Sequence, residues 1–418
     1  MSPNRIIMLL ATALAISVAT ASLAADDNRF PATPDAAWDA AFTRASGWTG
    51  GDVAGTVDLG DGRVLWLFGD SWIGTVAHGR HASGSRMVNN AIAIQAEQPG
   101  AKADIRFYWQ GGMKDLKAWI APPADKKKPN GWYWPAGGGC VVPGPGGRPR
   151  LVIFLFHIGK QEGKGGIWGF KSLGSTMATV DNIADPVEKW QVRQFDIPFA
   201  VAADEGQAAA NQKLRKREIS WGVAACLNQP NGESASGGWF YIYGVRIDSP
   251  LNRQLLLARA KIDAPSQFDA WQFYAGGGKW SAAAADAAPV AEGVAPELSV
   301  ERLPSGKESS PGQRPAWIMV YSESPLGRKI FARTADRPEG PWSERKAVYS
   351  VPELERNRVY FEYAAKGHFC LSGRDALLIT YLVNSTDFAA MVGDASIYRP
   401  RFIRVPLADI FSPLKDRR

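Results

Sequence analysis

The sequence predicts an all-β fold: a five-bladed β-propeller of four-stranded antiparallel blades, preceded by a short N-terminal helix. Two observations lead to this prediction. The 418 residues include 43 glycines and 28 prolines, which favour turns and interrupt helices. A strongly apolar, aromatic run of strand length also recurs five times, flanked each time by further strand-like runs. One such sheet cannot cover both of its faces, so the units must pack together. The alternative is a β-sandwich with long loops.

The composition is that of a globular protein with a substantial core. Hydrophobic residues make up 45% and charged residues 21% of the chain, and the formal net charge is +7. The basic residues are scattered, and no nucleic-acid recognition motif is present, so we expect no nucleic-acid partner.

Residues 1–24 are predicted to be a signal peptide. Arg5 supplies the positive start, Ile6 to Val18 form the apolar stretch, and Ser22-Leu23-Ala24 offers small residues for cleavage. We expect a secreted or periplasmic protein with no integral membrane span after cleavage; the alternative is an uncleaved signal anchor.

Residues 25–46 are predicted to form an N-terminal segment with one short helix. Thr33 is the expected N-cap and Pro34 the first helical residue, with the helix running to about Arg44. The propeller is expected over residues 47–412, as a single domain.

Each blade is predicted from a central apolar strand and its neighbours. The central strands are 64–70, 151–157, 239–245, 317–323 and 376–382. The strands before them are 51–57, 138–143, 220–227, 296–303 and 365–372, and those after them are 87–95, 175–181, 254–262, 329–336 and 400–407. Weaker fourth strands are 105–110, 190–196, 271–276 and 344–350. Polar or Gly-rich insertions at 111–131, 201–217, 277–295 and 304–315 are expected to be loops.

Asp52 and Asp70 are the candidate catalytic pair. They lie at the start of one predicted strand and at the end of the next. In an antiparallel hairpin these points meet at one sheet edge, so both carboxylates should share one face. Glycoside hydrolysis needs such a pair, one protonated and one ionised. The alternative is that both are turn residues.

The motifs around this pair resemble a known family. The motifs are spread over nearly all of residues 47–407. The first are WTGGD, DGRVLWLFGDSWIG and MVNNAIAI, and the later ones are NGWYWPAGGG, ISWGVAAC, FYIYGVR, EGPWS, YAAKGH, YLVNS and YRPRFIRV. They look like secreted bacterial five-bladed propellers, long labelled a domain of unknown function. That family is similar to arabinanase/levansucrase-type glycosidases and has an endo-D-arabinofuranase branch acting on mycobacterial arabinan. The resemblance implies that Asp52 and Asp70 are the acidic pair and that Glu218 is a third catalytic acid. Ser71 stands where Thr is common.

Further polar and aromatic residues are candidates for substrate binding. Flat aromatic rings bind sugar faces, and amides, imidazoles and cations bind hydroxyls. The candidates are Trp48, Trp72, Asn90, Trp221, Lys366, His368, Asn384 and Arg399. For the tryptophans the alternative is packing between blades, and for Arg399 it is hydrogen bonding to backbone carbonyls. Strand alternation allows only one of Asn89 and Asn90 to point inward.

No metal site or cofactor is expected. Cys140, Cys226 and Cys370 form no CxxC pair, and each lies in an apolar run, so buried, unreactive thiols are predicted. The chain has four histidines and no phosphate-binding loop. The carboxylate pair and the resemblance together predict a secreted glycoside hydrolase that acts on a polysaccharide or oligosaccharide. The resemblance implies a furanoside-containing substrate, with arabinan first and D-arabinan as a variant. The alternatives are a non-catalytic carbohydrate-binding propeller and an envelope interaction propeller.

Overall fold

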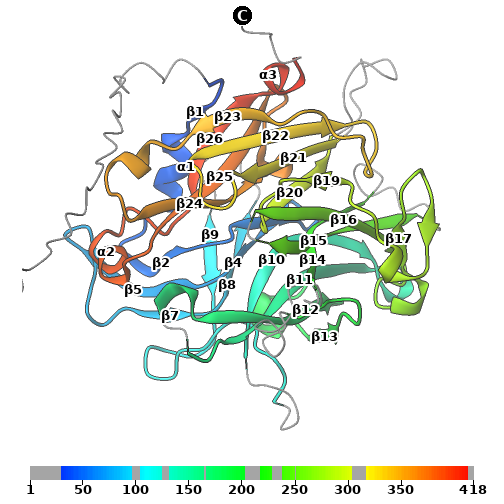
Figure 1. The fold of residues 1–418 in the computed structure, drawn as a ribbon. Coiled ribbons are helices and arrows are strands. Elements are labelled where there is room, and N and C mark those ends of the chain that lie inside the picture. The colour runs from blue at the N-terminus through cyan, green and yellow to red at the C-terminus, as the bar shows by residue number, and fades with distance from the viewer. Residues whose placement is uncertain are drawn as a thin grey trace, which may run out of the picture.

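The computed structural model describes residues 30–96, 104–124, 131–163, 166–202, 217–227, 238–249, 251–303 and 317–412. In these ranges the chain is mostly β and forms six antiparallel sheets (Figure 1). The expected signal peptide lies outside the described residues. No helix in the described ranges is long and apolar enough to cross a membrane.

Five larger sheets follow one another along the chain. The first contains β3 (Gly55–Asp58), β4 (Arg63–Phe68), β8 (Ala91–Ala96) and β9 (Ile105–Tyr108). The second contains β10 (Trp132–Pro143), β11 (Pro149–Lys160), β12 (Phe170–Val180) and β13 (Val192–Asp196). The third contains β14 (Glu218–Leu227), β15 (Trp239–Ser249), β16 (Asn252–Lys261), β17 (Gln272–Tyr274), β18 (Trp280–Ser281) and β19 (Ala291–Glu292).

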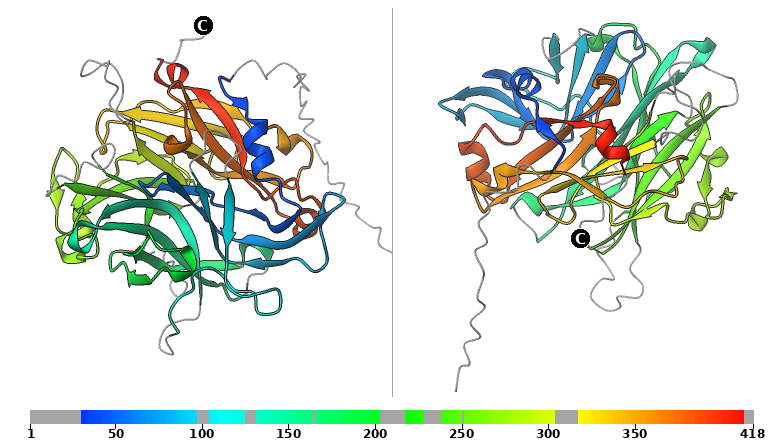
Figure 2. Two further views of the ribbon diagram at one scale, coloured as in Figure 1. Left: turned by 180° about the vertical axis from the view of Figure 1, so that it is seen from behind. Right: turned by 90° about the horizontal axis from the view of Figure 1, so that it is seen from above.

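The last two of these sheets bring the two ends of the chain together. The fourth contains β20 (Leu298–Arg302), β21 (Trp317–Ser322), β22 (Lys329–Ala335) and β23 (Lys346–Ser350). The fifth contains β24 (Tyr360–Gly367), β25 (Ala376–Ser385), β26 (Arg401–Pro406) and β1 (Thr33–Pro34). The sequence predicts no fourth strand for this last sheet. The N-terminal strand β1 supplies it by pairing with β26, beside which it lies in both views of Figure 2.

A sixth, smaller sheet extends from the first. It contains β2 (Ser46–Gly51), β5 (Ser71–Ala77), β6 (Arg80–His81) and β7 (Arg86–Val88). The predicted strand 51–57 is therefore divided: β2 ends at Gly51 and β3 begins at Gly55, with Asp52 in the bend between them. The predicted strand 87–95 is likewise divided at Asn89 and Asn90.

The N-terminal helix is shorter than expected. Helix α1 spans Ala36–Ala41, and Asp35, not Thr33, is its N-cap: the Asp35 carboxylate accepts a hydrogen bond from the Trp38 backbone N–H at 3.1 Å. Thr33 and Pro34 pair with β26 as a strand instead. The other α-helices are α2 (Phe388–Gly393) and α3 (Leu407–Phe411).

The hydrophobic core lies between consecutive sheets. Four clusters of buried side chains join the first sheet to the second, the second to the third, the third to the fourth and the fourth to the fifth. A fifth cluster, with Trp38 of α1 and Trp66, Phe68 and Phe402, joins the first sheet to the last. Each of the five larger sheets therefore packs against two others through buried apolar side chains. Fully burying one large apolar side chain stabilises the fold by about 1.5–3 kcal/mol.

The first strands of the five larger sheets also contact each other in chain order. β3 contacts β10, β10 contacts β14, β14 contacts β20, and β20 contacts β24. Between the last and the first, Thr56 Oγ1 lies 2.8 Å from His368 Nδ1. Residues at the same end of these five strands therefore lie close together, although they are far apart in the sequence.

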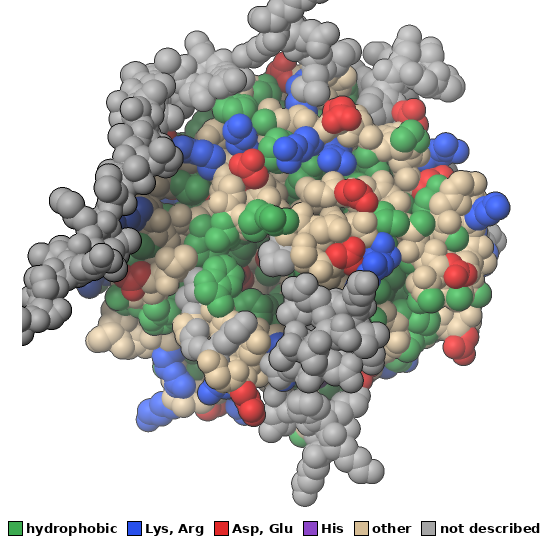
Figure 3. Space-filling model, viewed as in Figure 1, with side chains coloured by type: hydrophobic (Ala, Val, Ile, Leu, Met, Phe, Trp, Pro, Cys, Tyr) green, Lys and Arg blue, Asp and Glu red, His purple; other side chains and the backbone are tan. Residues whose placement is uncertain are grey.

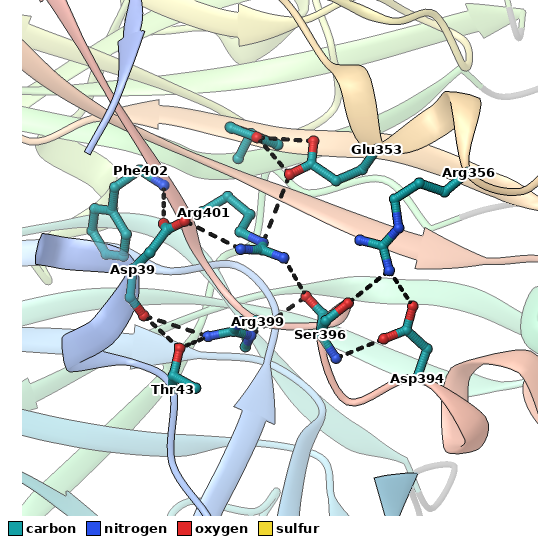
Figure 4. Close-up of polar contacts among 10 residues, drawn as sticks. Asp39, Thr43, Glu353, Arg356, Asp394, Ser396, Arg399, Arg401 and Phe402 are labelled. Carbon is teal, nitrogen blue, oxygen red and sulfur yellow. Dashed lines mark hydrogen bonds and ion pairs between the residues drawn. The ribbon is translucent and has the colours of Figure 1, made fainter. Parts of the chain in front are cut away.

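A polar network fastens α1 to the C-terminal strand (Figure 4). Arg399 donates to the Thr43 hydroxyl and to the Asp39 carbonyl. Arg401 pairs with the Asp39 carboxylate at 3.1 Å and lies 3.8 Å from Glu353. Arg399, predicted to bind substrate, is thus used to hold the chain ends together, which matches its structural alternative.

Candidate active site

One cavity, of about 800 Å³, opens at one end of the first strands. It is lined by residues that precede β3 and β20, that follow β4, β21 and β25, and that belong to β10, β16, β24 and α2. Asp52, Asp70, Glu297, Glu323 and Glu362 supply five carboxyl groups to its wall. We call this space the acidic cavity.

Asp52 and Asp70 meet where the chain crosses from the small sheet to the first large one. The Asp52 N–H donates to the Asp70 carbonyl at 3.3 Å, and the Gly69 N–H donates to the Asp52 carbonyl at 3.2 Å. A side chain on Gly69 would lie 2.3 Å from Asp52 Oδ1, so glycine is required at this crossing. The structure therefore brings the two predicted carboxylates to one cavity.

The backbone beside Asp52 adopts a conformation that non-glycine residues rarely take. Val53 and Ala54 have φ of 66° and 50°, and two further residues at the site, Ala364 and Tyr398, have φ of 59° and 57°. For a β-branched residue such as Val53 this is an outlier. Each such residue costs about 1–3 kcal/mol, and such strain gathers at functional sites.

Asp52 is held by two tyrosines from the far end of the chain. Tyr363 and Tyr398 donate to Asp52 Oδ2 at 2.8 and 3.0 Å. Burial is the main cause that raises the pKa of Asp52 well above its usual value, and the charges of Asp70 and Glu297 raise it further, whereas the two tyrosine hydrogen bonds oppose the rise. Asp52 therefore tends to keep its proton.

Asp70 accepts hydrogen bonds from two other neighbours. Trp134 Nε1 donates to Asp70 Oδ1 at 2.8 Å, and Asn89 Nδ2 donates to the same oxygen at 3.2 Å. Burial raises the pKa of Asp70 to about 6, and these two donors moderate the rise. Asp70 is thus mostly ionised at neutral pH, beside a carboxyl group that holds its proton more strongly.

Two further acids were not found from the sequence. Glu297 precedes β20 and pairs with buried Lys366 at 3.1 Å. It occupies the position before a first strand that Asp52 occupies before β3, so the same rule would have found it. Glu362, on β24, is 1% exposed, and the Ser322 hydroxyl donates to its Oε1 at 2.5 Å. Burial raises the pKa of Glu362 to about 8. No local pattern marks this residue.

Exposed aromatic and apolar side chains surround the carboxylates. Trp168, Leu326 and Phe388 line the acidic cavity and are 50%, 49% and 52% exposed. The Trp168 ring lies 5.7 Å from Phe361, and Trp134 makes an edge contact with Phe170 at 4.7 Å. Figure 3 shows that hydrophobic side chains gather near the centre of one face of the molecule. Such rings are suited to bind the apolar faces of sugars.

The other predicted acid and binding residues lie differently. Asn384 lines the acidic cavity, and Lys366 reaches it through Glu297. Glu218 is not among the lining residues; it interacts with Arg253, whose charge opposes the rise that burial gives to the pKa of Glu218. It is Asn89, not Asn90, that reaches a carboxylate: Asn90 is fully buried and bonds to the carbonyls of Ile120 and Tyr133.

Four residues predicted to bind substrate are buried in the core and are not among the residues that line this cavity. Trp48 packs on Phe107, Trp72 stacks on His81, and Trp221 contacts Phe273. His368 lies between the hydroxyls of Thr56 and Thr380 at 2.8 and 2.7 Å. For the three tryptophans the structure favours the packing alternative, because apolar rings between sheets gain free energy from burial. His368 is a buried, hydrogen-bonded histidine.

A second cavity, of about 1080 Å³, lies at the opposite end of the first strands and is lined by the three cysteines. Cys140 and Cys226 are half-buried and Cys370 is exposed, so the prediction that all three are buried is wrong for Cys370. Burial raises the pKa of Cys140 and Cys226. Within the described ranges, no three His, Cys, Asp or Glu side chains are arranged to hold a metal ion.

Comparison with known proteins gives a family and a shared fold. A family model described as "Domain of unknown function (DUF5005)" matches residues 35–408. Notoamide biosynthesis cluster protein J of Aspergillus sp. (strain MF297-2) is 32% identical over 114 residues, which are 26% of this chain and 27% of that protein. A proposed hydrolase from Bacteroides ovatus ATCC 8483 has a TM-score of 0.64 at 20% identity, covering 92% of this chain and 93% of its own. The exo-β-1,3-galactanase of Phanerochaete chrysosporium gives 0.42 at 10% identity, covering 87% of this chain and 63% of that chain.

Proposed function

The chain belongs to the family described as a domain of unknown function, DUF5005, and from this premise we propose that it is a glycoside hydrolase built on a five-bladed β-propeller. The contacts among β3, β10, β14, β20 and β24, the core clusters between consecutive sheets, and the contact of the last sheet with the first all support the propeller. On this view the small sheet of β2 and β5–β7 is an extension of the first blade.

The observation that carries the proposed activity is the buried carboxyl pair in an open cavity. Asp52 and Asp70 adjoin each other, and their environments raise both pKa values, that of Asp52 the more strongly. Glycoside hydrolysis requires one protonated and one ionised carboxyl group on either side of the scissile bond. Asp52 would donate a proton to the leaving oxygen, and Asp70 would act as base or nucleophile.

The neighbours of the pair fit these roles. Tyr363 and Tyr398 fix the Asp52 carboxyl through Oδ2, which leaves Oδ1 to carry the proton. Trp134 and Asn89 both bond to Oδ1 of Asp70, which leaves its Oδ2 for the reacting water or sugar carbon. Glu297, paired with Lys366, keeps a negative charge near Asp52 and so favours its protonated form.

The proposed substrate is a furanoside-containing polysaccharide, with arabinan first and D-arabinan as a variant. The cavity accommodates a few sugar rings, and its exposed Trp168 and Phe388 offer platforms for them. The furanoside preference rests on the resemblance of the motifs around Asp52 and Asp70 to those of arabinanase-type propellers. We also propose that the protein is exported through residues 1–24; mass spectrometry of the mature chain would test cleavage after Ala24.

A binding protein without catalysis is the second candidate, and the exposed aromatic side chains favour it. A carbohydrate-binding surface, however, needs no buried carboxyl pair. Burying a carboxyl group costs free energy, because it either loses its charge or lies near another negative charge. Amide side chains could bind sugar hydroxyls without this cost. This cost favours the enzyme.

The deciding experiment incubates the mature protein with arabinans, fructans, galactans and mycobacterial arabinogalactan, beside Asp52→Asn and Asp70→Asn. Released oligosaccharides that are lost with both variants support the proposal. An aryl glycoside with a good leaving group separates the roles: Asp52→Asn should retain activity on it because little proton donation is needed. Asp70→Asn should not, unless azide replaces the missing nucleophile. Glycan binding without release in the wild type would favour the binding protein.

A further inference from the structure

Glu362 differs from the other carboxyl groups of the acidic cavity in having an oxygen that is both buried and without a hydrogen-bond partner among the described residues. The residue is 1% exposed and lines the cavity. Its Oε2 is buried and has no hydrogen-bond partner among the described residues. A buried polar atom left in this way costs about 1–3 kcal/mol, so its retention needs an explanation.

The hydrogen bonds around Ser322 indicate which oxygen of Glu362 carries a proton. The Ala365 N–H donates to Ser322 Oγ at 2.9 Å, and the Ser322 hydroxyl in turn donates to Glu362 Oε1. In this arrangement Ser322 Oγ accepts from the backbone and directs its own hydrogen at Oε1. Oε1 is therefore an acceptor, and a proton on this carboxyl group belongs on Oε2.

We propose that Glu362 is a third functional carboxyl of the acidic cavity, which keeps its proton on Oε2 and donates it in a hydrogen bond to an oxygen of the bound sugar. The proposal rests on the proposed function in that the ligand is a glycan. It adds a specificity residue that neither accepts the catalytic proton nor attacks the sugar. A carboxylic acid kept neutral at its site is an effective donor to a substrate oxygen.

The charges around Glu362 favour its neutral form. The charged and titratable groups of the cavity wall are Asp52, Asp70, Arg253, Glu297, Glu323, Tyr363 and Tyr398. Burial is the main cause that raises the pKa of Glu362, to about 8, and the charge of Glu323 adds to the rise. The Ser322 hydrogen bond opposes it. Below pH 8 the carboxyl group is a donor; above pH 8 it becomes an anion without a donor hydrogen.

Glycan binding should therefore weaken as the pH rises through about 8. The test uses Asp52→Asn, which prevents turnover and removes the other group with a strongly raised pKa. Calorimetry measures its affinity for a linear arabinan oligosaccharide from pH 6.5 to 9.5. If the anion does not bind, affinity falls by about 30-fold between pH 7 and 9.5.

Variants at Glu362 and at its neighbour separate the donor role from a structural one. In the same background, Glu362→Gln keeps a donor at the Oε2 position, so it should bind within about threefold at pH 7 and show no fall above pH 8. Glu362→Met, which has no donor, should bind about 10- to 100-fold more weakly at pH 7. Glu323→Gln is the matched control: it keeps the fall and moves it to lower pH, because a negative charge beside Glu362 is removed.

Several results would overturn the proposal. It fails if Glu362→Gln keeps the alkaline loss of affinity, or if it binds as weakly as Glu362→Met at pH 7. Infrared spectra without ligand must also show a protonated carboxyl band at pH 7 that Glu362→Gln lacks. Failure of the proposed function looks different: the wild type would bind the oligosaccharide with this pH dependence and never cleave it. A protein that binds none of the glycans contradicts both.

Discussion

Replacing Asp70 by asparagine should stabilise the protein at neutral pH. Burial raises the pKa of this carboxyl group from 3.8 to about 6 in the native state. Between these values the unfolded chain has released its proton while the native state still binds one, so stability falls as the pH rises. Each pH unit between these two pKa values lowers the free energy of unfolding by about 1.4 kcal/mol, so the total decrease is about 3 kcal/mol by pH 7.5.

Asp70→Asn removes this loss without removing the hydrogen bonds. Its side-chain oxygen can still accept from Trp134 and Asn89. Urea unfolding at several values between pH 4 and 7.5 should show the variant up to about 3 kcal/mol more stable than the wild type at pH 7.5 and equal to it near pH 4. Asp263→Asn, which changes an exposed carboxyl group, is the control and should follow the wild type. A variant less stable than the wild type at pH 7.5, or one with the same pH dependence, would refute the reasoning.

Three further results are expected. Trp168→Ala should raise KM about tenfold with little change in kcat, in steady-state kinetics on an active glycan, because its half-exposed ring lines the cavity without touching the carboxyl pair. Burial lowers the pKa of His368 from 6.5 to about 3. Only the unfolded chain then gains a proton at residue 368 as the pH falls from 6.5, so urea unfolding should show the wild type losing about 4 kcal/mol of stability relative to His368→Asn by pH 3. Arg399→Met should lower stability by about 1–3 kcal/mol with KM unchanged, because Arg399 bonds to Thr43 and Asp39 and not to the cavity.

The strands were predictable because their signal is local. Each of the five central apolar runs falls within a strand of the structure, namely β4, β11, β15, β21 and β25, apart from one or two terminal residues. Period and turn residues suffice for such elements. The N-terminal strand β1 was missed because Thr33-Pro34 also begins helices, and its true partner β26 is more than 360 residues away.

The acidic cavity was predictable only where its residues are close in sequence. Asp52 and Asp70 are 18 positions apart and face each other across one crossing, so a rule about strand ends found them. Tyr363 and Tyr398 reach Asp52 from 311 and 346 residues away. Their position depends on how the last sheet meets the first, which no local pattern specifies. For Trp48, Trp72 and Trp221 the residue type predicted sugar binding, but burial between sheets decided their place.

The strained residues indicate which of the two cavities is the functional one. Of the five non-glycine residues with positive φ in the described ranges, Val53, Ala54, Ala364 and Tyr398 lie in or beside the acidic cavity. Packing alone would select glycine at such positions, as it does at Gly137 and Gly222. Val53 and Ala54 instead lock the chain directly after Asp52, and Tyr398 has the conformation that brings its hydroxyl to the same carboxylate. A stiff backbone is needed where a carboxyl group must keep one position while its proton is transferred, and the cavity of the cysteines has no such residue among those that line it. The free energy stored in this backbone is therefore best explained by the chemistry proposed for Asp52 and Asp70.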